Sequence, residues 1–311
     1  YFDGTYHLFY QSNAGWCHAA SSDLLHWVQL PQALFEDELG QCYSGTAAAD
    51  WNNTAQLQKG QLPTLLAFYT GWPNKKDVEK NGEKNATQCM AYSNDGGFNW
   101  TKYEHNPILP FWGTGSRDPK VFYHAPSEHW VMILFTTKHG NNVNEQNKVN
   151  GFSTFISKDL KNWEETDFTP DRFECADLFE LPVQGGEPGM KKWVMVDGNG
   201  TYFIGTFDGK KFTPETERHR GDWGGVLRQH FMATQTWSDM PQGRRVQVAW
   251  MRHFDRKIFP QKGMPFNQLM TFPVDLTLRM TPQGPRLFSW PIPEIKKLHG
   301  QSWSSEGAQQ M

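Results

Sequence analysis

The feature that most constrains the fold is a short pattern that recurs along the chain: Ser-x-Asp, then Trp after three or four intervening residues. It occurs at Ser21–Trp27, Ser93–Trp100 and Ser157–Trp163, so that successive Trp residues are 73 and 63 positions apart. A fourth, degenerate copy at Thr206–Phe212 keeps the Asp and replaces the Trp by Phe. Repeats of this length, each able to hold about four short strands, predict the blades of a β-propeller, with the Asp turn closing the outer hairpin of each blade.

Apolar runs of strand length dominate the rest of the sequence and are separated by Gly, Asn, Asp and Pro. They lie at residues 6–10, 64–69, 130–135, 193–196 and 245–250. No long segment keeps a helical period, so the sequence predicts an all-β fold. Counting the last strands before Arg279 as one more unit predicts a five-bladed β-propeller over residues 1–285. The alternative is that the same turns belong to an unrelated β-sandwich.

Two short clusters carry carboxylates that can do chemistry. Asp118 stands in Ser116–Lys120, and Glu174 follows it by 56 positions in Phe173–Phe179. The inner strands of a propeller converge on a central funnel, so residues this far apart in sequence can meet there. Paired carboxylates are typical of enzymes that cleave glycosidic bonds. The chain also contains 14 Trp and 22 Phe, whose flat faces suit sugar rings, although many of them must be core.

Composition excludes several other classes of function. The net charge is −3, which gives no polycationic surface for nucleic acid. No stretch reaches the roughly 18 apolar residues of a membrane span. The four Cys residues are scattered without a Cys-x-x-Cys pair, which argues against a structural zinc site or a redox motif. We therefore expect an oligo- or polysaccharide as partner, and no metal or organic cofactor.

Five motifs, in order along the chain, resemble those of glycoside hydrolase family 32, which contains invertases, levanases and inulinases. They are Tyr1–Gln11, Trp16–Trp27, Tyr43–Ala47, Arg117–Phe122 and Glu174–Leu181. One such motif alone is weak evidence, whereas five in order are specific. The resemblance implies a propeller that hydrolyses β-fructofuranosidic bonds in fructans or sucrose with retention of configuration. It also implies an extracellular or periplasmic protein, with levan or inulin favoured over sucrose.

The same resemblance implies roles for individual residues. Glu174, in the Glu-Cys motif, is expected to be the general acid that protonates the leaving oxygen and then the base that activates water. Such an acid is expected to be buried beside another carboxylate. Asp118, in the Arg-Asp-Pro motif, is expected to bind fructose hydroxyls and favour the charged transition state, with Arg117 orienting nearby groups. The matched positions around the sugar are Gln11 and Trp16 in the pocket and Ser44 near its rim.

The chain departs from the family's pattern at the nucleophile. The family places that Asp in a Trp-Met-Asn-Asp-Pro-Asn-Gly segment ahead of the Tyr-x-Asp-Gly strand pair, and residues 1–311 contain no such segment. Asp3-Gly4 is a favoured two-residue hairpin loop, so Asp3 is not expected to replace it. We expect an incomplete first blade with an exposed sheet edge, and little or no turnover by this polypeptide alone.

Two other departures concern the loops and the C-terminus. Four residues separate Gln11 from Trp16, where the family carries a longer loop, so the pocket wall is expected to differ. The family continues into a β-sandwich beyond its propeller. Residues 286–311 are therefore expected to be a linker toward a β-sandwich domain that is missing from this chain.

Other functions remain open at this point. A catalytically silent fructose- or fructan-binding fragment would keep Asp118, Glu174 and Trp16 as a sugar pocket. Another propeller glycosidase, of the arabinanase or xylosidase type, would also place carboxylates around a funnel, but without the Arg-Asp-Pro and Glu-Cys pairing. A sialidase shares the Asp turn, yet it needs an arginine cluster for the carboxylate of its substrate.

Overall fold

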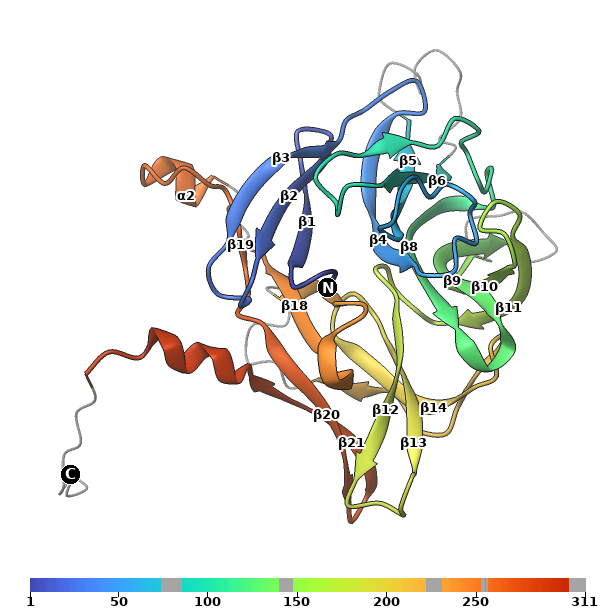
Figure 1. Cartoon of the computed structure of the whole chain (residues 1–311). Helices are drawn as coiled ribbons and strands as arrows, with labels where there is room; N and C mark the ends of the chain where they lie inside the picture. The colour runs from blue at the N-terminus through green and yellow to red at the C-terminus, as the bar shows by residue number, and fades with distance from the viewer. Residues whose placement is uncertain (74–85, 140–147, 222–230, 253–254, 256, 302–311) are drawn as a thin grey trace.

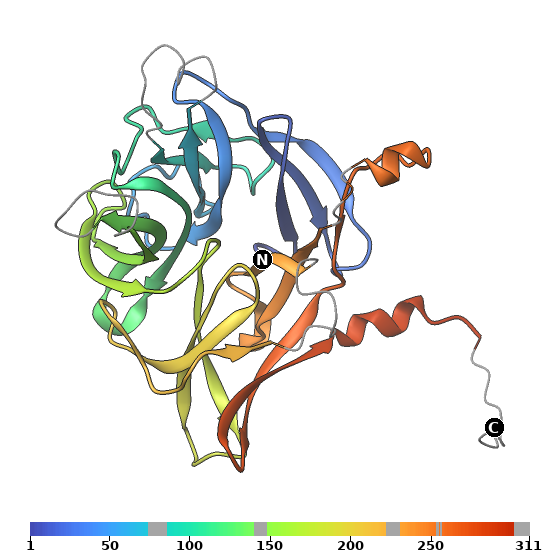
Figure 2. The ribbon, with the colours of Figure 1, turned by 180° about the vertical axis from the view of Figure 1, so that it is seen from behind.

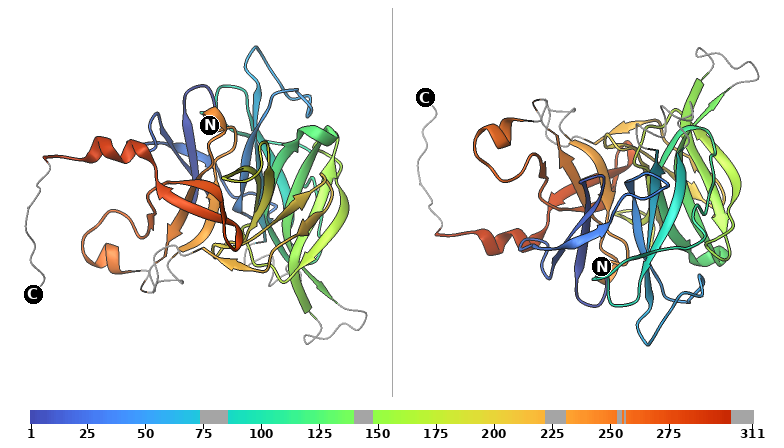
Figure 3. Two further views of the ribbon diagram at one scale, coloured as in Figure 1. Left: turned by 90° about the horizontal axis from the view of Figure 1, so that it is seen from below. Right: turned by 90° about the horizontal axis from the view of Figure 1, so that it is seen from above.

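The computed structural model describes residues 1–73, 86–139, 148–221, 231–252, 255 and 257–301. Its strands form sheets arranged in a ring, with the N-terminus near the centre of the view (Figure 1, and from behind in Figure 2). The short helix α2 (Ile258–Gln261) and the segment after the last strand project from the same side of the ring (Figure 3). Within the described residues, the other helical turns are of the 3-10 type, at Ala125–Ser127, Pro241–Gly243 and Pro293–Leu298.

Three of the four sheets in the described residues consist of antiparallel strands in sequence order. The first contains β1 (Tyr6–Ser12), β2 (Gly15–Ser21) and β3 (Val28–Leu34). The second contains β4 (Gln41–Asp50), β5 (Thr64–Trp72), β6 (Thr87–Ser93) and β7 (Thr101–Lys102). The third contains β8 (Thr114–His124), β9 (His129–His139), β10 (Lys148–Ser157) and β11 (Glu164–Pro170).

The fourth sheet joins two groups of strands. One group is β12 (Asp177–Gln184), β13 (Lys191–Val196), β14 (Thr201–Phe207), β15 (Phe212–Pro214) and β16 (His219–Arg220). The other is β17 (Phe231–Thr236), β18 (Val246–Met251), β19 (Leu269–Met270), β20 (Val274–Thr281) and β21 (Gly284–Pro291). A short parallel pairing links them, Val183 with Leu278 and Gln184 with Arg279.

The core lies between the faces of neighbouring sheets. On β9, Trp130, Met132 and Leu134 pack toward the second sheet, and the alternate residues Val131 and Ile133 pack toward the fourth. Because both of its faces are covered, β9 is a continuous apolar run rather than an alternating one. The ring closes where the first sheet packs against the last strands, through Tyr6, Leu24, Trp237, Val246 and Val248.

Each of the four Asp turns lies where the repeat predicts it, in the hairpin between two consecutive outer strands: β2 and β3, β6 and β7, β10 and β11, β14 and β15. In every turn one Asp oxygen accepts two backbone N–H bonds, at 2.7–3.1 Å, from residues two to four positions later. The four residues are Asp23, Asp95, Asp159 and Asp208. Such a side chain replaces backbone partners that the tight turn leaves unpaired.

The structure confirms the all-β class and the propeller arrangement, whereas the count of five blades stays a prediction because the last two strand groups share one sheet. The five expected apolar runs lie in β1, β5, β9, β13 and β18. The expected domain boundary at residue 285 falls within β21, and the division into a propeller and a linker stays a prediction. Among the described residues, no helix has the length and apolar character needed to cross a membrane.

Candidate active site

Asp118 is placed by two irregularities in β8. The pairing with β9 shifts between Thr114 and Arg117 and again between Arg117 and Lys120, so that Asp118 and Pro119 face a single residue of β9. A bulge of this kind re-aims a side chain and takes a backbone group out of the ladder. Asp118 has a φ of +62°, and its N–H donates at 3.0 Å to Thr70 Oγ1 of the neighbouring sheet.

Glu174 lies in the loop just ahead of β12, where the backbone is again left-handed. The φ angles of Glu174 and Cys175 are +35° and +44°, a conformation that costs non-glycine residues energy and is common at functional sites. Gly198 holds this loop, since its N–H donates at 2.9 Å to the Glu174 carbonyl. A Cβ at Gly198 would lie 3.0 Å from Cys175 Cβ and 3.1 Å from Glu174 O, so the close approach requires glycine.

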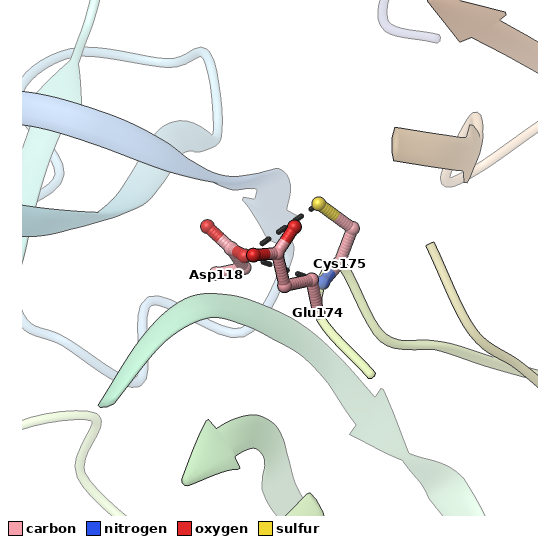
Figure 4. Close-up of side chains that lie close together, drawn as sticks. All are labelled: Asp118, Glu174 and Cys175. Carbon is pink, nitrogen blue, oxygen red and sulfur yellow. Dashed lines mark hydrogen bonds between the residues drawn. The ribbon is translucent and has the colours of Figure 1, made fainter. Parts of the chain in front are cut away.

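The structure brings the two predicted carboxylates together, with Arg117 between them. Arg117 Nη2 donates to Glu174 Oε1, and Arg117 Nε lies 3.7 Å from Asp118 Oδ2. Cys175 donates to the same Asp118 oxygen through its N–H at 3.3 Å and its thiol at 3.5 Å, as Figure 4 shows. The guanidinium of Arg117 lies 4.4 Å from the centroid of the Phe135 ring, which fixes it from the other side.

Burial dominates the electrostatics of this cluster. Asp118 is buried, which raises its pKa to about 6; Arg117 opposes the shift and Glu174 adds to it. Burial, with the negative charges of Asp118 and Glu174 nearby, also raises the pKa of the Cys175 thiol well above its usual value. Cys175 therefore stays protonated and serves as a hydrogen-bond donor, and Asp118 is poised to change charge in weakly acidic solution.

A cavity of about 1040 Å³, lined by residues of all four sheets, adjoins the cluster. The expected sugar-contact residues Gln11, Trp16 and Ser44 line it together with Asp118 and Cys175. Trp16 is buried and its indole N–H donates at 2.8 Å to the Tyr43 carbonyl, so it can offer the cavity only part of its ring.

Arg117 and Glu174 do not line the cavity themselves. They lie directly behind two residues that do, because Arg117 contacts Asp118 and Glu174 precedes Cys175 in the chain. Asp3, by contrast, is exposed in a tight hairpin turn closed by Phe2 and Thr5, with φ of +45° at Asp3 and +79° at Gly4. Asp3 thus occupies the turn that the sequence predicts for it.

Sequence reasoning missed several polar residues at this site. Thr70 accepts the hydrogen bond of the Asp118 N–H, Gln235 lines the cavity and contacts the Cys175 loop, and Asp239 lines the cavity from the connection between β17 and β18. Gln235 lies in β17 and Asp239 follows that strand, and no motif marks either residue. Their only signal is the fold itself, which brings β17 to the cavity.

Three side chains of the cluster could in principle hold a cation. Ligand atoms of Asp118, Glu174 and Cys175 all lie within 4.8 Å of one another. Arg117 already places a positive charge against both carboxylates, and the raised pKa of Cys175 keeps its sulfur in the thiol form, which ligates poorly. This donor set suits proton transfer and the binding of hydroxyl groups better than it suits a metal.

Comparison with known proteins adds to this geometry. The family model described as the glycosyl hydrolases family 32 N-terminal domain matches residues 1–291. The levanase of Bacillus subtilis (strain 168) is 36% identical over 97% of this chain and 45% of its own length. An extracellular exo-inulinase of Aspergillus niger is 32% identical over 82% of this chain and 54% of its own length.

Solved structures agree with the fold. A crystal structure of the exo-inulinase of Aspergillus awamori aligns with a TM-score of 0.75 at 27% identity, over 94% of this chain and 63% of that one. The chain spans about half the length of the curated relatives that it matches.

Proposed function

Because the chain belongs to glycosyl hydrolase family 32, we propose that it forms the catalytic domain of an enzyme that hydrolyses β-fructofuranosidic bonds in fructans or sucrose. The names of its relatives, levanase and exo-inulinase, support a fructan such as levan or inulin as the substrate. The relatives named as extracellular exo-inulinases support a place outside the cell for this protein as well.

The observation that carries this proposal is the contact of Asp118 with Glu174, bridged by Arg117 beside the cavity. An oxygen of each carboxylate lies within 4.8 Å of the other. Inverting glycosidases need about 6.5–9.5 Å between their two carboxyl groups to admit a water molecule. The close pair instead suits a site in which one carboxyl transfers a proton and the other binds the sugar.

We assign proton transfer to Glu174. The expectation that this acid is buried was wrong, because its side chain is 29% exposed. It can therefore reach a leaving-group oxygen, and Arg117 orients it. General acid and base catalysis of this kind contributes about 10² to 10⁴ in rate. Asp118, buried and held by Cys175, binds fructose hydroxyls and stabilises positive charge that develops on the ring. Gln11, Ser44 and the exposed part of Trp16, which line the same cavity, complete the sugar contacts.

Retention of configuration also needs a nucleophilic carboxylate, and neither residue of the pair is free for that role. Glu174 must carry the proton, and one oxygen of Asp118 already accepts two bonds from Cys175. We propose that residues 1–311 alone turn over slowly or not at all, and that activity is gained when a Trp-Met-Asn-Asp-Pro-Asn-Gly segment is added experimentally to supply this carboxylate.

Fructose release tests this proposal. Levan, inulin and sucrose are incubated with residues 1–311, with the same polypeptide extended by that segment, and with a matched extension whose Asp is replaced by Asn. Near-UV circular dichroism establishes that all three are folded. We expect fructose only from the polypeptide with the Asp extension. If the folded extended protein releases no fructose from any of the three substrates, the assignment is wrong.

A silent fructose-binding role is the second candidate, because Asp118 and the cavity residues Gln11, Trp16 and Ser44 are in place without any added segment. Calorimetric titration of residues 1–311 with fructose and a short fructan separates the two. Binding by the extended polypeptide without hydrolysis would favour the silent binder.

A further inference from the structure

The two carboxylates of the site belong to different sheets. Asp118 is on β8 in the third sheet, and Glu174 precedes β12, the strand of the fourth sheet that pairs with β13 and β20. No backbone ladder joins β8 to β12 in the described residues. The distance between the carboxylates is therefore set by side-chain contacts between the sheets. The repeat pattern in the sequence does not specify these contacts.

A buried lysine makes the main contact of this kind. Lys120 follows Asp118 by two positions, and its ammonium lies 3.0 Å from Asp177 Oδ1, three positions after Glu174. The exposed fractions of the two side chains are 3% and 0%. The same ammonium lies 3.3 Å from the Thr236 carbonyl and 3.5 Å from Gln235 Oε1, both on β17. One charged group thus connects the strands β8, β12 and β17.

Gln235 extends this connection to the loop that carries Glu174. Its side-chain amide donates to the carbonyls of Cys175 and Ala176 at 3.1 and 3.0 Å. The neighbouring Thr236 N–H donates at 2.7 Å to Asp177 Oδ2. A register shift in β17 between Met232 and Gln235 turns Gln235 toward this loop.

We propose that Gln235 is a positioning residue which, with the Lys120–Asp177 ion pair, fixes the Glu174–Cys175 loop against Asp118. A catalytic role for Glu174 and Asp118 rests on the proposed function, whereas the positioning of the Glu174–Cys175 loop does not. Gln235 acts through the Cys175 and Ala176 carbonyls, to both of which its side-chain amide donates.

The reactivity of the four buried cysteines tests the clamp without any need for hydrolysis. Gln235→Met keeps the length of the side chain and removes both donors. The matched control is Gln32→Met, which removes a single bond of the same type, to the Leu34 carbonyl at 2.9 Å, from a side chain that does not line the cavity. Each variant is treated with iodoacetamide in native buffer, and the alkylation rate of each cysteine is followed by peptide mass spectrometry.

Cys175 and Cys17 are the informative pair, because both line the cavity and both are 8% exposed. Loss of two hydrogen bonds is expected to increase the population of molecules in which the Cys175 loop is open. The alkylation rate of Cys175 should therefore rise by about 10- to 30-fold relative to that of Cys17. A general loss of stability would raise all four rates together. An unchanged ratio of Cys175 to Cys17 in Gln235→Met, or an equal rise in Gln32→Met, overturns the proposal.

A second variant tests the ion pair in the same assay. Lys120→Met combined with Asp177→Asn removes both charges and keeps an acceptor for the Thr236 N–H, so the fold is expected to survive. The alkylation rate of Cys175 is again expected to rise relative to that of Cys17. An unchanged ratio of the two rates would overturn the role of the ion pair.

In the extended polypeptide, Gln235→Met is expected to lower kcat on levan about tenfold or more with little change in KM. A raised KM with unchanged kcat would instead make Gln235 a sugar contact and refute positioning. A selective rise at Cys175 in a polypeptide that hydrolyses nothing would leave the clamp standing and refute the proposed function alone.

Discussion

Replacement of Lys120 by Met is predicted to destabilise the fold strongly, because it leaves the buried Asp177 carboxylate without the ammonium group that pairs with it. Lys120 and Asp177 are almost fully buried and lie 3.0 Å apart. Removal of one partner of such a pair typically costs about 3–5 kcal/mol, since the remaining charge has no water to solvate it. For a domain of this size each kcal/mol lowers Tm by about 2–4 °C, so we expect a drop of about 6–20 °C.

Urea unfolding followed by far-UV circular dichroism measures this loss. Lys191→Met is the control, because Lys191 pairs with Glu180 at 3.1 Å on the surface, with both side chains substantially exposed. An exposed pair contributes about 0–1 kcal/mol. Adding Asp177→Asn to Lys120→Met should recover most of the loss. The reasoning is refuted if Lys120→Met costs no more than Lys191→Met, or if Asp177→Asn recovers nothing.

Three further predictions concern pH and the Glu174 loop. Burial, aided by the N-terminal ammonium, lowers the pKa of His7 to about 4; burial, aided by His7, lowers that of His18 to about 3. The unfolded chain thus binds more protons below about pH 6.5, and the urea midpoint should fall on acidification more steeply than in a His7→Leu/His18→Leu variant. Burial raises the pKa of Asp118 to about 6, so its proton stabilises the fold below about pH 4 and this contribution is lost as pH rises through 6. Asp118→Asn should therefore gain stability relative to the parent by about 2 kcal/mol between pH 4 and 8, and equal differences at both pH values would contradict this. Gly198→Ala should cost about 1–3 kcal/mol in the same unfolding assay, because its Cβ meets Cys175 and Glu174, and a neutral result would show that the loop yields freely.

Much of the fold could be predicted from the sequence because it depends on interactions between residues that are close together along the chain. Each Asp turn needs only an Asp side chain that accepts nearby backbone N–H groups, and all four turns form where the repeat predicts. The apolar runs are strands because their residues are covered on both faces. The meeting of Asp118 and Glu174, 56 positions apart, also follows once the inner strands share a centre.

The parts that could not be predicted depend on contacts between sheets. The bulges in β8 turn Asp118 out of the ladder, with a positive φ at Asp118. The sequence does not reveal this conformation, because the residue there is not a glycine. The polar side chains that hold the site, Thr70, Lys120 and Gln235, come from three different sheets and share no motif. Trp16 lines the cavity as expected, yet its burial against Tyr43 could not be inferred from its place in a strand.

The most direct test of the central claim, that Glu174 is the proton-transferring group of a fructan hydrolase, is fructose release from levan by paired substitutions in the extended polypeptide. Glu174→Gln keeps shape and hydrogen bonding but cannot transfer the proton. Glu180→Gln changes an exposed glutamate of β12 that pairs with Lys191 on the surface. We predict that Glu174→Gln lowers kcat by about 10² or more and that Glu180→Gln leaves it unchanged. Turnover by Glu174→Gln at the rate of the parent would contradict the account.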